Sequence, residues 1–262
     1  MGWKYRNTVV GADIEGIVRS ARPCRGRAFV SWYGHRSRPI PVIMCAWQRP
    51  ERMATTLRLL AAQDNRGFEL VVWCNNRAIL ADVLGAVAKT RAPFGTTVWD
   101  SPVNIGGFSR FYCARAMRRE GRPHVIFIDD DAEFGPAMVS TFLREAAPKK
   151  ITSSFGTRFH KGWGNKTYKV SAGSPLDWAG TGLMCADASI FSDPELYQVP
   201  KEYWFLEDVW LSYYAKVARK WRLEKSHNWL RLIHDTRGLF QARPHRILYR
   251  MIKDLRARGW NC

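Results

Sequence analysis

The sequence predicts a single α/β domain built on a mostly parallel β-sheet flanked by helices. From residue 40 onward, short apolar runs alternate with segments of helical periodicity, a pattern typical of a parallel sheet. The first run, 41–47 (PVIMCAW), is apolar without interruption, as expected for a strand covered on both faces. A length of 262 residues with 46% hydrophobic residues is enough to bury one large core, so we expect one domain rather than two.

The first expected elements follow one another as strand, loop and helix. After the strand 41–47, Pro50 suits the first turn of a helix. The run 68–73 predicts a second strand, and a helix over 79–89 leads to a short third strand over 96–99. These units predict the half of the sheet in which the strands run parallel.

The second half of the chain contains the most informative junction. Gly106 lies in a break before a helix over 108–120, and the apolar strand 124–128 runs directly into three aspartates. The remaining expected elements are a helix over 136–146, strands over 151–155 and 168–172, a basic aromatic loop over 156–166, a helix over 207–220 and a basic amphipathic terminal helix over 240–258.

The chain is strongly basic, with a formal net charge of +18. Residues 1–38 hold eight Lys and Arg against two acids, and residues 236–262 hold seven against one. We therefore divide the chain into a basic N-terminal extension (1–38), the α/β domain (39–235) and a basic C-terminal helical extension (236–262). This charge predicts a polyanionic partner, either nucleic acid or an anionic membrane surface, although solvated termini are the simpler alternative.

Other features of the sequence bear on where the protein works. No apolar run approaches the roughly 20 residues of a membrane span, and the first residues lack the apolar stretch of a secretion signal. The six cysteines are scattered singly, without metal-ligand spacing, which predicts reduced and packed thiols. We therefore expect a cytoplasmic protein, located in the host cytoplasm if a phage encodes it.

The three carboxylates Asp129, Asp130 and Asp131 close the strand 124–128. Their mutual repulsion raises at least one pKa unless a cation lies nearby. Open α/β sheets bind ligands outside the carboxyl ends of their strands, where these side chains lie. Extended backbone would point Asp129 and Asp131 the same way, which predicts an oxygen cluster for Mg²⁺ or Mn²⁺. The alternative is a solvated acidic turn that caps the next helix.

The ordered motifs resemble those of GT-A glycosyltransferases, particularly family 2. The resemblance is carried by PVIMCAWQRPERMATTLRLLAAQ, VVWCNN, NIGGFSRFYCARA, VIFIDDDAEF, WAGTGLMCADASIF, WFLEDVWL and a late HD, which together span residues 40–235. It implies a Rossmann-like GT-A domain that transfers a sugar from a nucleotide-sugar donor with the help of Mn²⁺ or Mg²⁺.

The resemblance also implies roles for individual residues. Asp208 matches the base and Glu207 the other member of that acidic pair, while Asp131, Asp129 and His234 match metal ligands. The residues that match the nucleotide-sugar site are Ala46, Trp47, Arg49, Asn75, Asn76, Asn104, Gly106, Arg110, Asp129, Asp130 and Gly180. Each motif keeps a structural alternative: first-turn acids of a helix, a packed histidine, a simple Asn-Asn turn and a loop glycine.

One motif departs from the family. Where the second strand usually ends in an acidic residue that holds uracil, this chain has Cys74-Asn75-Asn76, closer to the WNN of some exostosin-like transferases. A UDP-sugar donor is therefore expected from the other motifs rather than from this one.

The expected reaction is metal-dependent transfer of the sugar to an acceptor hydroxyl, with inversion in a single displacement, although a retaining mechanism would use the same acidic motifs. The basic extensions and the loop 156–166 favour 5-hydroxymethylpyrimidine DNA, of the kind that phages glycosylate, as the acceptor. One alternative is a protein or an anionic surface glycan at a membrane, with the terminal helix as an interfacial anchor. A second is a nucleic-acid-binding module without catalysis.

Overall fold

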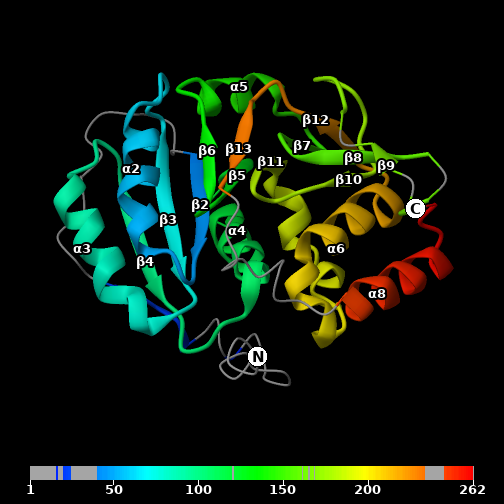
Figure 1. Ribbon diagram of the computed structural model, residues 1–262, viewed down its shortest axis with the longest axis horizontal. Helices are drawn as coiled ribbons and strands as arrows, with labels where there is room; N and C mark the ends of the chain where they lie inside the picture. The colour runs from blue at the N-terminus through cyan, green and yellow to red at the C-terminus, as the bar shows by residue number, and fades with distance from the viewer. Residues whose placement is uncertain are drawn as a thin grey trace.

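The computed structural model is an α/β fold in which a central sheet carries helices on both faces (Figure 1). It describes residues 16, 20–24, 40–119, 121–160, 162–164, 166–167, 169–233 and 245–261. Most of the N-terminal extension and part of the C-terminal extension lie outside these residues, so the division into three segments stays a prediction.

The helices are α2 (Met53–Ala61), α3 (Leu80–Thr90), α4 (Ser109–Arg119), α5 (Met138–Glu145), α6 (Glu207–Tyr213) and α8 (His245–Ala257), with a π-helical turn η7 (Tyr214–Ala218) after α6. Short 3₁₀ turns are η1 (Pro50–Arg52), η2 (Arg77–Ile79), η3 (Gly106–Phe108), η4 (Ala188–Ser192), η5 (Pro194–Tyr197) and η6 (Lys201–Leu206). The strands are β1 (Arg22–Pro23), β2 (Ile40–Ala46), β3 (Phe68–Cys74), β4 (Thr96–Asp100), β5 (His124–Asp129), β6 (Ala132–Phe134), β7 (Lys150–Ser153), β8 (Gly156–Phe159), β9 (Lys166–Thr167), β10 (Trp178–Ala179), β11 (Leu183–Asp187), β12 (Arg222–Lys225) and β13 (Leu230–Leu232).

The main sheet has eight strands in the order β1-β4-β3-β2-β5-β11-β7-β12. The strands β4, β3, β2 and β5 are parallel, as expected from the strand-helix alternation. Strand β11 runs antiparallel between β5 and β7, and β12 pairs in parallel with β7. The predicted α/β class with a mostly parallel central sheet is confirmed.

Strand β2 shows why its sequence is apolar throughout. Its side chains alternate between two cores: Val42 and Met44 pack with α2 and α3, while Ile43 packs on the other face with α4. All three are fully buried. A strand that serves two cores has no solvent-facing position, so the alternation of polar and apolar residues disappears.

Several expectations for the second half of the chain are wrong. The expected loop over 156–166 begins with strand β8, which pairs with both β9 and β10. No strand forms over 169–172, the described part of the expected strand 168–172. The expected helix over 207–220 is α6 followed by the π-helical turn η7. Strands β6 and β13, which pair with each other, were not expected.

Helix α8 is amphipathic, but its apolar face is already used. Leu248, Met251, Ile252 and Leu255 are buried in the larger core cluster. The Tyr203 hydroxyl of η6 donates to Asp254 of α8 and holds the helix in place. This corrects the interfacial-anchor alternative, because the apolar face is not free to enter a membrane surface. Within the described residues, no helix has both the length and the apolar character needed to cross a bilayer.

The cysteines of the described chain agree with packed thiols. Cys24, Cys45, Cys74, Cys113 and Cys185 are free, and none of them is exposed. Burial raises the pKa of Cys74 to about 11, so its thiol stays protonated at neutral pH.

Candidate active site

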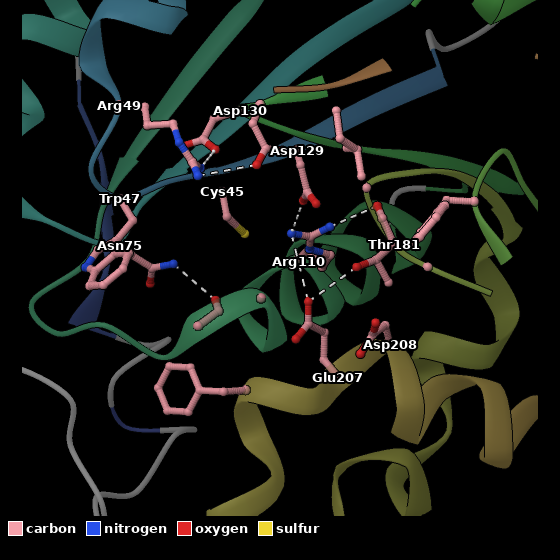
Figure 2. A pocket seen from close by; sticks show the side chains of 18 of the residues that line it. Cys45, Trp47, Arg49, Asn75, Arg110, Asp129, Asp130, Thr181, Glu207 and Asp208 are labelled. Atoms are coloured by element: carbon pink, nitrogen blue, oxygen red, sulfur yellow. Dashed lines mark hydrogen bonds and ion pairs between the residues drawn. The ribbon is translucent and has the colours of Figure 1, made fainter. Parts of the chain in front are cut away.

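A cavity of about 380 Å³ opens at the carboxyl ends of β2, β3 and β5 (Figure 2). This is where open α/β sheets bind their ligands, and the volume suits a small molecule. The predicted residues that line it are Trp47, Arg49, Asn75, Gly106, Arg110, Asp129, Asp130, Asp131, Gly180, Glu207 and Asp208.

Three predicted residues do not line the cavity but support its wall. The backbone carbonyl of Ala46 accepts from the Asn75 N–H at 2.8 Å. The Asn104 side chain accepts from the Gly106 N–H at 2.8 Å. The Asn76 side chain donates to the Trp47 carbonyl at 2.9 Å. His234 lies outside the described residues.

The acidic junction has a different geometry from the one expected. Strand β5 ends at Asp129, and the next two aspartates form a turn. The expectation that extended backbone points Asp129 and Asp131 the same way is therefore wrong. Arg110 Nη2 lies 2.8 Å from Asp129 Oδ1. Arg49 bridges the other two, with Nη1 2.8 Å from Asp130 Oδ1 and Nη2 3.4 Å from Asp131 Oδ2. Two arginines therefore counter the repulsion that the sequence predicted.

Burial differs among the three carboxylates. Burial raises the pKa of Asp130 to about 7; Arg49 opposes this rise and the neighbouring carboxylates add to it. The side chains of Asp129 and Asp131 are 35% and 22% exposed, and both line the cavity. Asp130 also lines the cavity, but its side chain is the most enclosed of the three and is bonded to Arg49.

The carboxylates at this turn supply some, but not all, of the ligands that a hard divalent cation needs. Within the described residues, no three His, Cys, Asp or Glu side chains form a preformed metal centre. Mg²⁺, however, is commonly bound by one or two carboxylates together with substrate phosphates, and Asp129 and Asp131 supply two such groups. The backbone N–H of Ile233 donates to the Asp131 carbonyl at 2.9 Å, so the chain passes beside this turn immediately before position 234.

The start of α6 provides a second acidic pair. The Glu207 carboxylate is packed so closely over Gly107 that a Cβ atom there would lie 1.8 Å from Oε1. Thr181 Oγ1 donates to the same oxygen at 3.3 Å. Burial raises the pKa of Glu207 to about 7, although Arg110 opposes the rise. Asp208 is half-buried, lines the cavity and accepts from the Val209 N–H at 2.8 Å.

Arg110 connects the two acidic sites. Its Nη1 donates to the Thr181 carbonyl at 3.0 Å, and its Nη2 lies 2.8 Å from Asp129 and 4.0 Å from Glu207. Burial alone would lower the pKa of Arg110, but the attraction of Asp129 and Glu207 outweighs it and holds the pKa above its ordinary value. The guanidinium therefore stays charged in the floor of the cavity.

Asn75 is fully engaged by the protein. Its Oδ1 accepts from Trp73 Nε1 and from the Ile105 N–H, both at 3.2 Å, and its Nδ2 donates to the Gly106 carbonyl at 3.1 Å. The side chain is buried. Asn75 thus joins the end of β3 to the η3 turn, which explains the asparagine better than a simple turn does.

Asn76 has a similar supporting role. It caps η2 by accepting from the Ala78 N–H at 3.1 Å, and its Nδ2 donates to the Trp47 carbonyl at 2.9 Å. The asparagine pair therefore positions two segments of the cavity wall, one through each side chain.

An aromatic and apolar part of the cavity wall was not predicted from the sequence. Phe205 packs on Gly106, which has φ +65°, and a Cβ there would lie 2.6 Å from the ring. Phe155 is brought in by the bond from the Gly180 N–H to its carbonyl at 2.7 Å. Phe205 could have been found, since it stands two residues before Glu207 in the same motif. The remaining lining residues are Cys45, Gln48, Gly107, Trp178, Thr181, Gly182, Leu230, Leu232 and Ile233.

No family model matches the sequence, and no curated protein matches it either. Solved structures do. TarS 1–349 of S. aureus in complex with UDP has 18% identity and a TM-score of 0.51, over 73% of this chain and 59% of that one. The same protein in complex with UDP-GlcNAc has 17% identity and a TM-score of 0.51, over 79% and 61%. The mannosyltransferase PcManGT from Pyrobaculum calidifontis, in complex with GDP-Man and Mn²⁺, has 15% identity and a TM-score of 0.51, over 72% and 55%.

The chain shares their fold. This likeness confirms the GT-A type α/β fold that the motifs led us to expect. The chain spans a little more than half of the length of these structures.

Proposed function

We propose that this protein is a glycosyltransferase that moves a sugar from a nucleotide-sugar donor to an acceptor hydroxyl. The observation that carries the proposal is the pair of acidic sites in one cavity, Asp129–Asp131 at the end of β5 and Glu207–Asp208 at the start of α6 (Figure 2). Proteins of the same fold support it, because their structures hold UDP, UDP-GlcNAc or GDP-Man. Fold alone does not fix function, so the proposal rests on the acids.

The β5 side is proposed to bind the donor diphosphate. Asp131 and Asp129 would hold Mn²⁺ or Mg²⁺ there, and we propose His234 as a further ligand because Ile233 is bonded to the Asp131 backbone. When bound, the cation stabilises the negative charge that develops on the diphosphate leaving group. The complex of PcManGT with Mn²⁺ supports this choice of metal.

The nucleoside is proposed to lie against Trp47, Asn75 and Gly106, which line the end of the cavity nearest β3. The Asn75 amide nitrogen donates to the Gly106 carbonyl, and we propose no single side chain for the recognition of uracil. A UDP-sugar is the first donor to test because TarS binds UDP and UDP-GlcNAc in this fold, and a GDP-sugar is the second.

On the α6 side, Asp208 is the proposed general base. It lines the cavity and would take the proton of the acceptor hydroxyl as that oxygen attacks the anomeric carbon. General-base assistance of this kind contributes about 10²- to 10⁴-fold to rate. Glu207, enclosed by Gly107, Thr181 and Arg110, positions the start of the helix. A single displacement of this kind inverts the anomeric centre.

For the acceptor, we propose DNA that carries 5-hydroxymethylpyrimidine. A formal net charge of +18 favours a polyanionic partner. A base inside a duplex would have to be extruded before its hydroxymethyl group could reach Asp208. The reaction would take place in the cytoplasm, where both DNA and nucleotide sugars are present.

The test is a donor screen scored by nucleotide release, run with Mn²⁺ and with EDTA, on hydroxymethylcytosine DNA and on unmodified DNA. Release that requires both the metal and the modified DNA is the expected result. Release with a glycan or protein acceptor but not with DNA would retain the enzyme class and replace the acceptor. Nucleotide-sugar binding without release from any acceptor would instead indicate a module without catalysis.

A further inference from the structure

Helix α8 presents a stripe of exposed cations. Arg246, Arg250, Lys253 and Arg256 are spaced four, three and three residues apart, so they share one face of the helix. All four are exposed, whereas the buried face of the helix lies opposite. We call these four residues the α8 stripe.

The cations of the stripe outnumber the acids of their own helix. Asp254 is the one acidic residue of α8, and it accepts a hydrogen bond from the Tyr203 hydroxyl. Tyr249, which is 65% exposed, lies on the same face as the stripe and adds an aromatic ring beside the cations. The face therefore carries the features expected of a surface that binds an anionic chain.

The length of the stripe suits a phosphodiester backbone. From Arg246 to Arg256 the helix rises about 15 Å, since each residue adds 1.5 Å. One strand of a B-form duplex carries about four phosphates over that distance, because its charges are about 3.4 Å apart along the axis. Since the strand also winds around the duplex, only some of these phosphates face one side, and the stripe is long enough to meet more than one of them.

Two paths of contacts connect α8 with the cavity. Trp260, just beyond the helix, packs on Trp163 with ring centroids 6.1 Å apart, and Trp163 packs on the cavity residue Trp178 at 6.4 Å. On the other path, Asp254 is bonded to Tyr203 of η6, the turn that leads directly into Glu207. The helix is thus fixed to the side of the cavity that carries Asp208.

The buried apolar face of α8 distinguishes nucleic acid from a membrane. An amphipathic helix binds a bilayer by inserting its apolar face, and here Leu248, Met251 and Leu255 occupy the core. Binding of phosphates needs only the exposed cations.

We propose that the α8 stripe is the docking surface for the phosphodiester backbone of the acceptor DNA. The choice of DNA rests on the proposed function, but docking itself requires neither donor nor turnover. Backbone contacts carry no sequence information, so the stripe binds unmodified and hydroxymethylated duplexes alike.

The test compares two triple variants by fluorescence anisotropy with a duplex of about 25 base pairs, between 50 and 200 mM salt, as suits phosphate contacts. R246Q/R250Q/K253Q removes three cations of the stripe. R58Q/R66Q/K89Q removes three exposed cations from the region of α2 and α3, at the opposite end of the molecule (Figure 1). Three lost phosphate contacts should raise Kd tenfold or more at low salt and flatten the slope of log K against log salt by about 2 to 3. The control variant should retain the wild-type slope.

An equal loss of duplex affinity in the two triple variants would overturn the inference, because binding would then depend on net charge rather than on the stripe. Wild-type binding by R246Q/R250Q/K253Q, or no duplex binding by the wild-type protein, would overturn it as well. The inference would also be overturned if R246Q/R250Q/K253Q lost binding to vesicles of anionic phospholipid but kept its affinity for DNA. A UDP-induced shift in Tm, measured on each protein, shows that the cavity is intact. Docking through the stripe without nucleotide release from any donor would sustain the inference and refute the proposed reaction.

Discussion

The two sides of the cavity are held together by different means. On the β3–β5 side, buried polar side chains fix single backbone groups: Asn75 bonds Ile105 and Gly106, and Asn76 bonds Trp47. On the α6–α8 side, aromatic rings pack on one another, from Trp178 through Trp163 to Trp260. A small rigid ligand needs a few atoms placed accurately, whereas a polymer needs a broad firm surface. The contrast therefore agrees with a nucleotide on one side and a polymer on the other.

The largest effect is expected at the α6 side of the cavity. Asp208→Asn removes the proposed base and should lower the rate of sugar transfer by about 10²- to 10⁴-fold. Nucleotide affinity should stay near that of the wild type, because Asp208 is proposed to act on the acceptor and not on the nucleotide. Asp82→Asn, an equal change at an exposed position of α3, is the matched control. A rate for D208N close to wild type would remove Asp208 from the chemistry.

Truncation of a buried ring on the α6–α8 side should reduce stability more than removal of a polar side chain on the β3–β5 side. Trp260 is buried and packs on Phe159, Trp163 and Tyr213. Trp260→Ala should reduce the free energy of unfolding by about 3–5 kcal/mol, measured by urea denaturation. Truncation of Trp229, which is 56% exposed, serves as the control and should cost much less. If both variants lost the same stability, ring packing would not be what holds this side.

The polar side should respond to removal of a single amide. Asn75→Ala leaves the Trp73 N–H, the Ile105 N–H and the Gly106 carbonyl without their partner, and each unsatisfied buried group costs about 1–3 kcal/mol. We expect a net loss of about 3 kcal/mol or more in urea denaturation, the lower end of the sum of the three costs. Asn75→Asp keeps both acceptor bonds but places a buried carboxylate oxygen against the Gly106 carbonyl, so it should lose more stability at neutral pH than at acidic pH, where the carboxyl is protonated. A loss in the aspartate variant that does not change with pH would contradict the hydrogen-bond assignment.

Gly107 tests how closely the two sides meet. Gly107→Ala places a methyl group against the Glu207 carboxylate and should cost about 1–3 kcal/mol through overpacking. In the double variant with Glu207→Ala, the space is free, so the combined loss should be smaller than the sum of the single losses. Additive losses in this double-mutant cycle would show that the two residues do not meet in solution.

The pH dependence of stability tests the burial of Glu207. Burial raises the pKa of Glu207 from 4.5 to about 7, so between these values the folded protein binds a proton that the unfolded chain has released. The contribution of Glu207 protonation to the free energy of unfolding is therefore fully present below pH 4.5 and is lost as the pH rises through about 7. Glu207→Gln should flatten this decline in Tm between pH 4.5 and 7.5. If the curves of Tm against pH ran parallel for the wild-type protein and Glu207→Gln, a group other than Glu207 would be responsible for the titration.

The parallel half of the fold could be predicted because its signals are local. A run such as that around Val42 and Ile43 reports burial on both faces wherever its partners come from. Strand β11 gave no such signal: it is short, mixes small and large residues (LMCAD), and is defined by pairing with β5 and β7, strands that lie well before it in the chain. The same reason explains β6 and β13, whose partners are separated by almost 100 residues.

The candidate site was predictable in its acids and not in what surrounds them. The triplet ending in Asp131 and the pair Glu207–Asp208 stand out in the sequence as carboxylates beside apolar runs. Their arginine partners do not, because Arg49 reaches Asp130 across 81 residues of chain. Local reasoning also extended β5 beyond Asp129, where the backbone turns. His234 stays a prediction.

Sharing of one guanidinium between Asp129 and Glu207 has an evolutionary consequence. A substitution at either acid changes the charge balance that Arg110 experiences, and the effect is passed to the other acid. Mutations on the two sides should therefore be epistatic. A lineage that altered its donor chemistry at Asp129 would be expected to adjust α6 as well, so preferences for donor and acceptor would drift together.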